Sequence, residues 1–273
     1  MLADLHVHSN YSDGSNTVEE IMDMAREKGV TLIGLVDHDT IRGIEHARLA
    51  GKERGITVIP AIEISAYNFK RNRKVHILGY GFQKEAKHIQ QLCEPLLQRR
   101  HANSLWQIEQ LQMNGYDIAY EDVVKHASPG GIIYKQHIMA CLTTAHFTTL
   151  AYKKLYKELF KGDGICARDI EYVDAIEAVR SIKGDGGLAV LAHPGQLNSF
   201  DMIHELVQNG LDGIERNHFD HSEEDMKKVE EYAEEYGLFL TGGSDFHGEF
   251  GKAIQIGEIT CPAEAVQQLM SIV

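Results

Sequence analysis

The chain has 273 residues, 43% hydrophobic and 25% charged, which is typical of a globular protein with a substantial buried core. Forty acidic and 27 basic residues give a net charge of -13. This balance argues against binding of long nucleic acid, because such binding depends on clustered Lys and Arg. No apolar run approaches the roughly 18–20 residues of a membrane span, and no signal peptide is visible at the N-terminus. We therefore expect a cytoplasmic protein without a membrane partner.

Short apolar runs alternate with helical patterns through much of the chain, which predicts βα units and a parallel sheet or barrel. Between the first two runs, residues 17–28 have helical periodicity, with Asn16 or Thr17 as the cap and Gly29 at the end. The predicted strands are residues 2–8, 31–37, 57–64, 75–80, 188–192, 213–216 and 238–242. A further run, residues 253–259, is a candidate for closing the sheet.

The strand rhythm stops between residues 85 and 164. Helical patterns over residues 87–114 and 138–160 occupy this stretch without a convincing strand. We therefore predict a barrel formed by residues 1–84 and 165–273, interrupted by a mostly helical insertion at residues 85–164. Inserted segments on such folds commonly cap the site and select the substrate.

Metal-ligating residue types gather at the ends of the predicted strands. In parallel α/β barrels the carboxyl ends of the strands build the active site. His6 and His8 lie two apart on one strand, so both imidazoles point the same way and can reach one ion. The other candidates at strand ends or in the loops after them are Asp13, His38, Glu63, His76, His193, Asp245 and His247. So many such placements are hard to explain as independent surface or packing residues.

The ligand types narrow the choice of metal. Imidazole and carboxylate without thiolate suit Zn²⁺, Mn²⁺ or Fe²⁺. The four cysteines, which have no CxxC spacing, are interpreted as reduced thiols. More than four ligands imply two or three divalent ions, with Glu63 as the natural bridge. Adjacent ions can activate a water and neutralise the oxygens of a phosphoryl group.

These motifs resemble those of the polymerase and histidinol phosphatase (PHP) family. The matching segments are His6-Val7-His8-Ser9, Ser12-Asp13-Gly14, Asp37-His38-Asp39-Thr40, Glu63, His76, His193-Pro194 and Asp245-Phe246-His247. The resemblance implies a distorted (β/α)7 barrel and a metal-dependent phosphoesterase. It implies one ion held by His6, His8, Glu63 and Asp245, a second held by Glu63, His76 and His193, and a third held by Asp13, His38 and His247. Some family members have histidine where this chain has Asp13.

The insertion is similar to that of small phosphoesterases that act on nucleotides. Those relatives usually carry Gly-Arg-Pro-His facing the substrate, whereas this chain has Tyr134-Lys135-Gln136-His137. The resemblance implies that Lys135 and His137 bind substrate. Lysine is a point charge and not a bidentate fork, so phosphate recognition is expected to differ.

Several further residues have two interpretations at this stage. His218 is either the general acid and a substrate ligand or a loop histidine in solvent. Glu215 either orients a metal ligand or ends a strand. Asp37 and Asp39 either orient His38 or form a turn. Arg99, Arg100 and His101 either meet a second phosphate or a base, or form an exposed helix face.

The sequence thus predicts hydrolysis of a phosphomonoester, with Glu63, Asp245 and His218 as catalytic residues. The expected substrate is a nucleoside 5'-monophosphate, a 3',5'-bisphosphate or a short 5'-phosphorylated RNA. The alternatives are a histidinol-phosphate or sugar-phosphate phosphatase of the same fold, an amidohydrolase-type C–N hydrolase, and a non-catalytic metal-binding module. An amidohydrolase commonly bridges its ions with a lysine after the fourth strand, where this chain has His76. The oligomeric state is left open.

Overall fold

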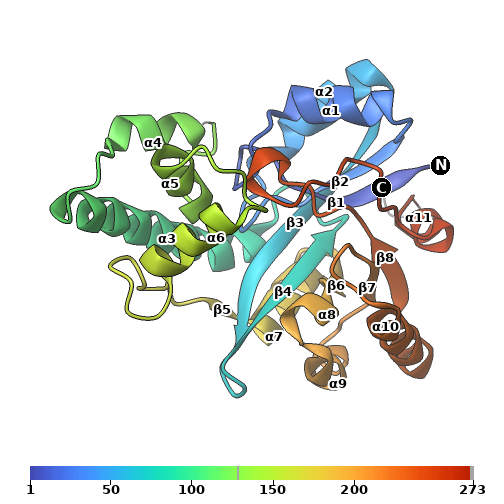
Figure 1. The fold of residues 1–273 in the computed structure, drawn as a ribbon. Coiled ribbons are helices and arrows are strands. Elements are labelled where there is room, and N and C mark those ends of the chain that lie inside the picture. Colours follow the sequence, from blue (N-terminus) through green and yellow to red (C-terminus); the bar gives the residue numbers. More distant parts are fainter. Residues whose placement is uncertain (128, 271–273) are drawn as a thin grey trace.

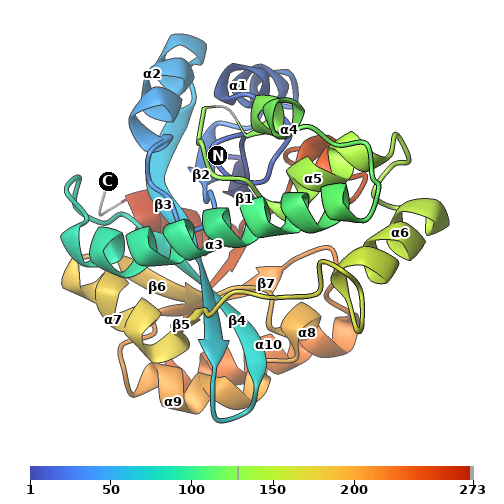
Figure 2. The same cartoon turned by 90° about the vertical axis from the view of Figure 1, so that its left-hand side faces the viewer.

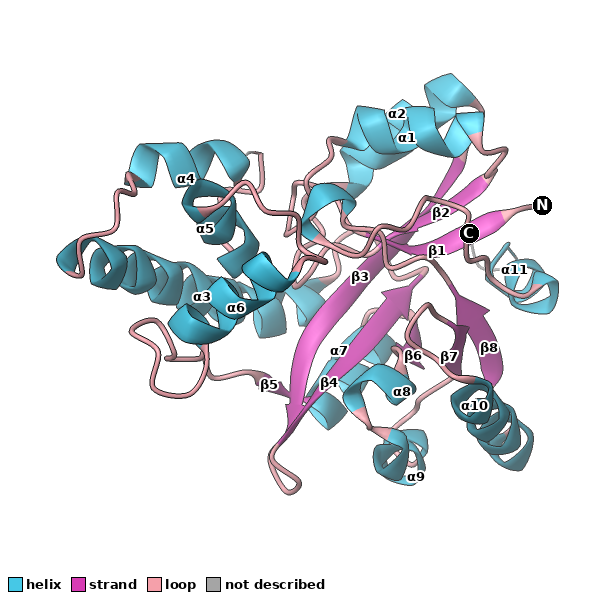
Figure 3. Ribbon diagram, viewed as in Figure 1, coloured by secondary structure: helices cyan, strands magenta, loops and turns pink. Residues whose placement is uncertain are grey.

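The computed structural model describes residues 1–127 and 129–270 and shows a nearly closed, barrel-shaped sheet with helices around it (Figures 1 and 3). The strands follow the order β1-β2-β3-β4-β6-β7-β8, and a short β5 pairs with β3 outside this path. After β8 the chain returns to β1, where Val7 forms an isolated bridge with Phe246. The predicted distorted barrel of seven strands with added helices is confirmed.

The strands are β1 Ala3–Val7, β2 Leu32–Leu35, β3 Thr57–Asn68, β4 Arg73–Tyr80, β5 Val173–Asp174, β6 Leu188–Leu191, β7 Gly213–Asn217 and β8 Phe239–Gly242. The α-helices are α1 Val18–Glu27, α2 Ile44–Arg54, α3 Lys87–Met113, α4 Tyr120–His126, α5 Lys135–Leu142, α6 Leu150–Phe160, α7 Ala175–Gly184, α8 Pro194–Leu197, α9 Ile203–Val207, α10 Glu223–Tyr236 and α11 Ala263–Met270. Two short 3-10 helices cover Phe200–Met202 and Gly248–Phe250.

One strand runs against the expected parallel direction. β4 is antiparallel to both β3 and β6, whereas the other neighbours on the path pair in parallel. The reason is the connection: only residues 69–72 join β3 to β4, which is too short for a helical crossover and forms a hairpin. The predicted parallel direction was therefore wrong at this strand.

The candidate eighth strand, residues 253–259, was also wrong. This segment contains turns, and the backbone N–H of Glu258 donates to the carbonyl of Gln255. Gly257 has a positive φ of 77°, and its N–H donates to the Asp4 carboxylate. A chain bent by these contacts cannot lie as an extended edge strand.

The α1 helix follows the sequence prediction closely. The Thr17 side chain accepts a hydrogen bond from the Glu20 N–H, and the Glu20 carboxylate accepts one from the Thr17 N–H, so the two form a capping box. Ile21 and Ala25 on its inner face are fully buried. Gly29, with a φ of 73°, follows the helix end as predicted.

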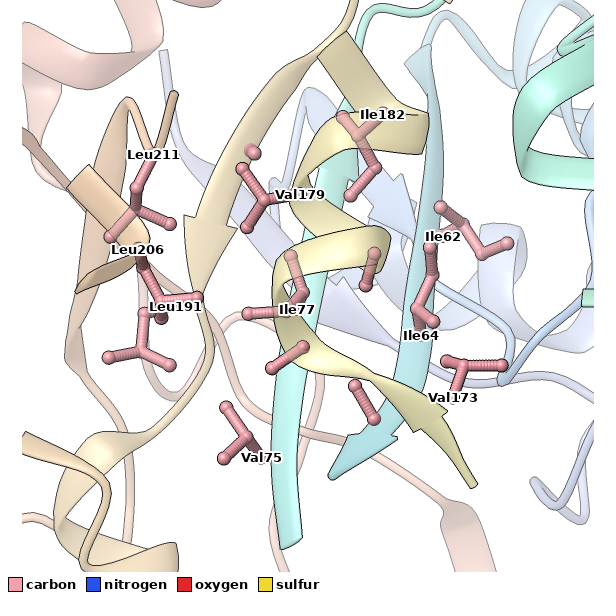
Figure 4. Close-up of a cluster of buried hydrophobic side chains, with 14 of the residues drawn as sticks. Ile62, Ile64, Val75, Ile77, Val173, Val179, Ile182, Leu191, Leu206 and Leu211 are labelled. Atoms are coloured by element: carbon pink, nitrogen blue, oxygen red, sulfur yellow. The ribbon is translucent and has the colours of Figure 1, made fainter. Parts of the chain in front are cut away.

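The largest core fills the space between β3, β4, β6 and the helices α7 and α9 (Figure 4). Ile62 and Ile64 of β3 and Ile77 of β4 point toward Val179 and Ile182 of α7. These positions alternate along the strands with polar ones, so that the other face of β4 is left for His76. Packing on one face of the sheet therefore fixes which side chains face the site.

The insertion stands to one side of the barrel, and α3 runs across its front in Figure 2. Its helices enclose a separate hydrophobic cluster that includes Leu111, Ile133, Ile138 and Phe160. The N-terminal part of α3 belongs to the barrel core, since Leu96 packs there. The barrel and insertion boundaries stay a prediction, but each part has its own core.

The predicted helix over residues 138–160 was wrong as one element, because residues 143–149 separate α5 from α6. The Thr143 hydroxyl, at the end of α5, accepts a hydrogen bond from the Ala145 N–H. The Thr149 hydroxyl accepts one from the Tyr152 N–H and so caps the start of a new helix, α6. The helix α4 and the strand β5 were not predicted. Among the described residues, no helix is long and apolar enough to cross a membrane.

Gly243 permits close packing beside His6. A Cβ atom at position 243 would clash with the backbone nitrogen and Cβ of His6 and lie 2.8 Å from Asp4 Oδ1. We predict that Gly243→Ala lowers the free energy of unfolding by about 1–3 kcal/mol, measured by urea denaturation, because it overpacks this contact. An unchanged unfolding midpoint would show that β1 and the loop after β8 are not packed as described.

Candidate metal centre and active site

One carboxylate lies at the centre of the predicted site. Glu63 on β3 is 1% exposed. Its two oxygens lie 2.8–3.5 Å from ring nitrogens of five histidines, namely His6, His8, His38, His76 and His193. These histidines come from β1, from β4 and from the segments after β1, β2 and β6, so the closing of the barrel itself brings them together.

Asp245 forms a second meeting point in the loop after β8. Its Oδ1 lies 3.3 Å from Nε2 of both His6 and His8, and 3.5 Å from Nδ1 of His247. Its Oδ2 lies 3.2 Å from Nε2 of His218. The predicted catalytic residues Asp245, Glu63 and His218 are therefore gathered within the same cluster.

Asp13 is the third carboxylate that is contacted by more than one histidine. Its Oδ1 lies 3.4 Å from His247 Nε2 and 3.8 Å from His8 Nδ1. Its Oδ2 accepts a hydrogen bond of 2.8 Å from the Gln136 side chain, which belongs to the insertion. Sequence reasoning singled out Lys135 and His137 on either side of Gln136 but missed Gln136 itself.

Three groups of side chains could each hold an ion, because their ligand atoms lie within 4.8 Å of one another. They are His6, His8, Glu63 and Asp245, then His8, Asp13, His38 and His247, and then His38, Glu63 and His76. The first group equals one predicted ligand set, and the second adds His8 to another. In the third group His38 stands where His193 was expected, although His193 Nε2 is 3.0 Å from Glu63. Which residue holds which ion stays a prediction.

Buried carboxylates hold the ligands in place. Glu215 is fully buried; it is 2.9 Å from His6 Nδ1 and accepts a hydrogen bond of 2.9 Å from the His193 N–H. Asp37 accepts hydrogen bonds from the Ser9 N–H, from the Ser9 hydroxyl and from the Ser12 hydroxyl, which fixes the loop that leads to Asp13. These contacts set ring orientation around a metal.

Asp4 on β1 supports the cluster, and sequence reasoning missed it. Its Oδ1 accepts a hydrogen bond of 2.9 Å from the Ser244 N–H, next to Asp245. The available signal was a carboxylate in the predicted first strand, two residues before His6 and therefore on the same face of the strand.

Three residues of the site have a left-handed backbone. Asp39, His193 and Asp245 have φ values of 61°, 23° and 51°. Such conformations cost about 1–3 kcal/mol each in residues other than glycine and persist where surrounding contacts enforce them. The conformational free energy of the left-handed backbone is therefore spent at residues that belong to the site.

The pKa values show how strongly the charges interact. Burial lowers the pKa of His8, but contacts with Asp245 and Glu63 outweigh it and raise the pKa to about 10. Burial raises the pKa of Glu63, yet the surrounding imidazoles, His38 and His6 first, bring it well below its usual range. Burial brings the pKa of His38 down to about 4. Glu63 thus releases its proton readily, and its charge attracts cations.

The donor set fits divalent ions. Both ring nitrogens of His8, Asp13 Oδ1 and His193 Nδ1 are buried without a hydrogen bond of acceptable geometry to any described residue. Unsatisfied buried nitrogen and oxygen atoms that face one another are costly in a protein interior unless an ion joins them. Neutral imidazole and carboxylate are ligands of Zn²⁺, Mn²⁺ and Fe²⁺.

The cluster borders a cavity of about 430 Å³ between the barrel and the insertion. A smaller hollow of about 260 Å³ lies over the metal ligands. The two spaces share five lining residues, Asp13, His38, His76, Gln136 and Phe147. A small molecule in the larger cavity can therefore extend to the ligand cluster.

The predicted substrate residues lie at different depths. Lys135, at the start of α5, lines the larger cavity. His137 is fully buried, its Nδ1 accepts a hydrogen bond from the Tyr134 N–H, and it is not among the residues that line the cavity. His218 is also buried against Asp245, and no atom of it lines either space. The substrate roles of Lys135, His137 and His218 stay predictions.

Arg100 links the insertion to the ligand His38. Its guanidinium donates to Asp39 at 2.6 Å and to the Ser65 hydroxyl at 3.0 Å. Ser65 Oγ lies 3.3 Å from His38 Nδ1. The interpretation of Arg100 as part of an exposed helix face was therefore wrong, whereas Arg99 is half-buried and donates to the Glu171 carbonyl.

Comparisons with known proteins agree with this geometry. A family model, the PHP domain, matches residues 4–273. The chain is 49% identical over 257 residues to phosphoribosyl 1,2-cyclic phosphate 1,2-diphosphodiesterase of Eggerthella lenta, covering 94% of this chain and 98% of that protein. It is 29% identical to 3',5'-nucleoside bisphosphate phosphatase of Chromobacterium violaceum, covering 92% and 90%. A metal-dependent phosphoesterase from Bifidobacterium adolescentis superposes with a TM-score of 0.89 at 26% identity, covering 99% and 96%.

The chain belongs to the PHP domain family. It is an enzyme, a metal-dependent phosphoesterase, as its motifs predicted.

Glu63→Gln should remove the charge that the cluster shares. We predict that bound metal, measured by elemental analysis, falls sharply and that phosphate release is lost, while the circular dichroism spectrum stays native. Glu215→Gln is the matched control; because it orients ligands without belonging to any of the three groups, it should lower metal affinity by about 10–100-fold. Full metal content and turnover in Glu63→Gln would refute the central role of this carboxylate.

Arg100→Met should leave the buried Asp39 without its cation. We predict a loss of about 3–5 kcal/mol in the free energy of unfolding, because an unpaired charge remains in the interior. The double variant Arg100→Met with Asp39→Asn should recover much of that loss in a double-mutant cycle. Additive losses in the cycle would contradict the pairing.

Proposed function

We propose that this phosphoesterase hydrolyses a phosphate ester of a small phosphorylated ribose compound. The first candidate is the 1,2-cyclic phosphate of ribose 5-phosphate, and the second is a nucleoside 3',5'-bisphosphate. The observation that carries the proposal is the continuity of the three ligand groups with a 430 Å³ cavity under the insertion. Such a volume suits one small molecule.

The relatives support the order of the candidates. The Eggerthella lenta protein, named for the cyclic ribose ester, aligns over nearly its whole length at 49% identity. The Chromobacterium violaceum protein, named for the bisphosphate, is more distant at 29%. The predicted nucleotide and sugar-phosphate substrates share a phosphorylated ribose or a similar polyol, so one cavity can be tested with both.

The residues would divide the work as follows. His6, His8, Glu63 and Asp245 would hold one divalent ion, with further ions at the groups centred on Asp13 and on His76. Two or three ions of Mn, Fe or Zn would supply positive charge and Lewis acidity for phosphoryl transfer. Glu215 fixes the orientation of His6, and Asp245 lies beside His218, the proposed proton donor to the leaving oxygen.

The cavity lining favours a small anion over a long polymer. Lysines and tyrosines of the barrel and insertion line the space, while the whole chain carries a charge of -13. Local positive charge inside an acidic protein attracts a small phosphate ester without forming the extended basic surface that long nucleic acid needs.

The test is a substrate panel with Mn²⁺-loaded protein, followed by ³¹P NMR and phosphate release. The panel contains phosphoribosyl 1,2-cyclic phosphate, adenosine 3',5'-bisphosphate, adenosine 5'-monophosphate, a short 5'-phosphorylated RNA and histidinol phosphate, with an amide and a lactone as the C–N and C–O hydrolase controls. We expect the cyclic ribose ester to have the highest kcat/KM. Preference for histidinol phosphate or RNA would refute the substrate, and hydrolysis of the lactone alone would refute phosphoester chemistry.

A further inference from the structure

Two lysines from different parts of the chain meet in the cavity, away from the ligand cluster. Lys74 lies on β4 of the barrel and Lys135 begins α5 of the insertion. Their ammonium groups lie 3.1 and 3.5 Å from the two oxygens of Asp169. Tyr172 joins the group, since its hydroxyl donates to Asp169 at 3.0 Å and accepts from Lys74 at 2.6 Å.

The charges of this group do not cancel. Two ammonium groups face one carboxylate, which leaves one positive charge. Two further cations line the cavity: Arg100 is paired with Asp39, and Lys153 is exposed. Lys74, Lys135 and Asp169 all line the cavity, with side chains 38%, 21% and 40% exposed, so a bound molecule can reach them.

The position of Lys74 relative to the metal ligands is set by the strand. Lys74 and His76 lie two residues apart on β4 and face the same side, so about 7 Å of strand separates them. Opposite them on β3 stand Tyr67 and Ser65, and the neighbouring Val75 points to the core on the other face. One substrate phosphate at the cluster thus leaves room for a sugar ring before a second anion reaches Lys74.

We propose that Lys74 and Lys135 form a second phosphate subsite in which Asp169 is an internal counter-ion that the substrate displaces. The inference rests on the proposed function and sharpens its substrate class: the ester carries a second phosphate about one ribose away from the reacting one. A phosphate dianion offers the two lysines more charge and more acceptor oxygens than one carboxylate does.

The elements that carry these groups favour such an exchange. The lysines lie on a strand and at the start of a helix, whereas Asp169 lies between α6 and β5 in a segment without regular structure. Its Oδ1 also takes the hydrogen bond from Tyr172, a donor that a phosphate oxygen can use after the exchange. Before substrate arrives, Asp169 keeps two like charges together and prevents their repulsion.

Both the barrel and the insertion contribute a lysine to the selection of the substrate. Lys74 belongs to the barrel and Lys135 to the insertion, so a phosphate held by both lysines joins the two parts. A monophosphate engaged at the cluster leaves Asp169 in place. A substrate with two phosphates therefore binds more tightly than one that lacks the distal group.

The experiment compares metal-loaded wild-type protein and Lys74→Gln on ribose 1,2-cyclic phosphate with and without its 5-phosphate. We expect Lys74→Gln to lower kcat/KM for the 5-phosphorylated ester by at least about tenfold, which is one charge-assisted hydrogen bond, and to change the other by less than about twofold. Lys74→Arg should restore most of the activity, because it keeps the charge. Equal effects on both esters would overturn the proposal.

Asp169→Asn and Lys70→Gln complete the design. Asp169→Asn removes the competing carboxylate, so KM for the 5-phosphorylated ester should fall several-fold at low ionic strength and not rise. Lys70→Gln removes an exposed lysine that pairs with Glu205 outside the cavity, and it should match wild type. A higher KM in Asp169→Asn, or a Lys70→Gln defect equal to that of Lys74→Gln, would refute the exchange.

Failure of the subsite and failure of the proposed function give different results. If no ribose ester is hydrolysed, the proposed function fails. Calorimetric binding of adenosine 3',5'-bisphosphate and adenosine 5'-monophosphate then tests the subsite alone. A bisphosphate preference lost in Lys74→Gln supports the subsite, whereas equal binding of the two nucleotides to wild type overturns it.

Discussion

A single buried carboxylate, Glu63, is approached by five imidazoles, and the rest of the structure depends on that contact. Five rings around one carboxylate are stable only if the strands that carry them converge. The barrel supplies this convergence, and the hydrophobic cluster behind β3 and β4 holds Glu63 and His76 on the same side of the sheet. The fold and the site therefore depend on the same strand register. A shift of register by one residue would turn the side chains of Glu63 and His76 into the core.

The strand-borne part of the site could be predicted from the sequence because strand periodicity places residues such as His6 and His8. Residues that lie two apart on a strand point to the same face of the sheet. The end of an apolar run marks the end of a strand, where the active site of such a barrel lies. Asp13 and Asp245 lie in loops after strands, where order along the chain still indicates nearness. The interrupted strand rhythm predicted the helical insertion, and the resemblance to a known family added the expected grouping of the ligands.

Other features depend on contacts between distant residues, which no local pattern reveals. In the sequence, Arg100 resembles any other charged residue on a long helix. Its pairing with Asp39 depends on the packing of α3 against the barrel. Gln136 gave no signal beside Lys135, yet it is the one that contacts Asp13. The reversed direction of β4 follows from a connection of four residues, which appears only because both strands extend beyond their predicted bounds. The predicted single helix is interrupted before Thr149, whose hydroxyl caps the start of α6.

The separate hydrophobic cores of the barrel and the insertion have an evolutionary consequence. Side chains of α5 and α6 can change against their own core without moving Glu63 or His76, so the accepted ester can drift while the reactive centre is inherited intact. After gene duplication, one of the two enzymes can become specific for a different metabolite through a few replacements in the insertion. Natural selection can thus alter the substrate-binding insertion while the catalytic residues of the barrel stay the same.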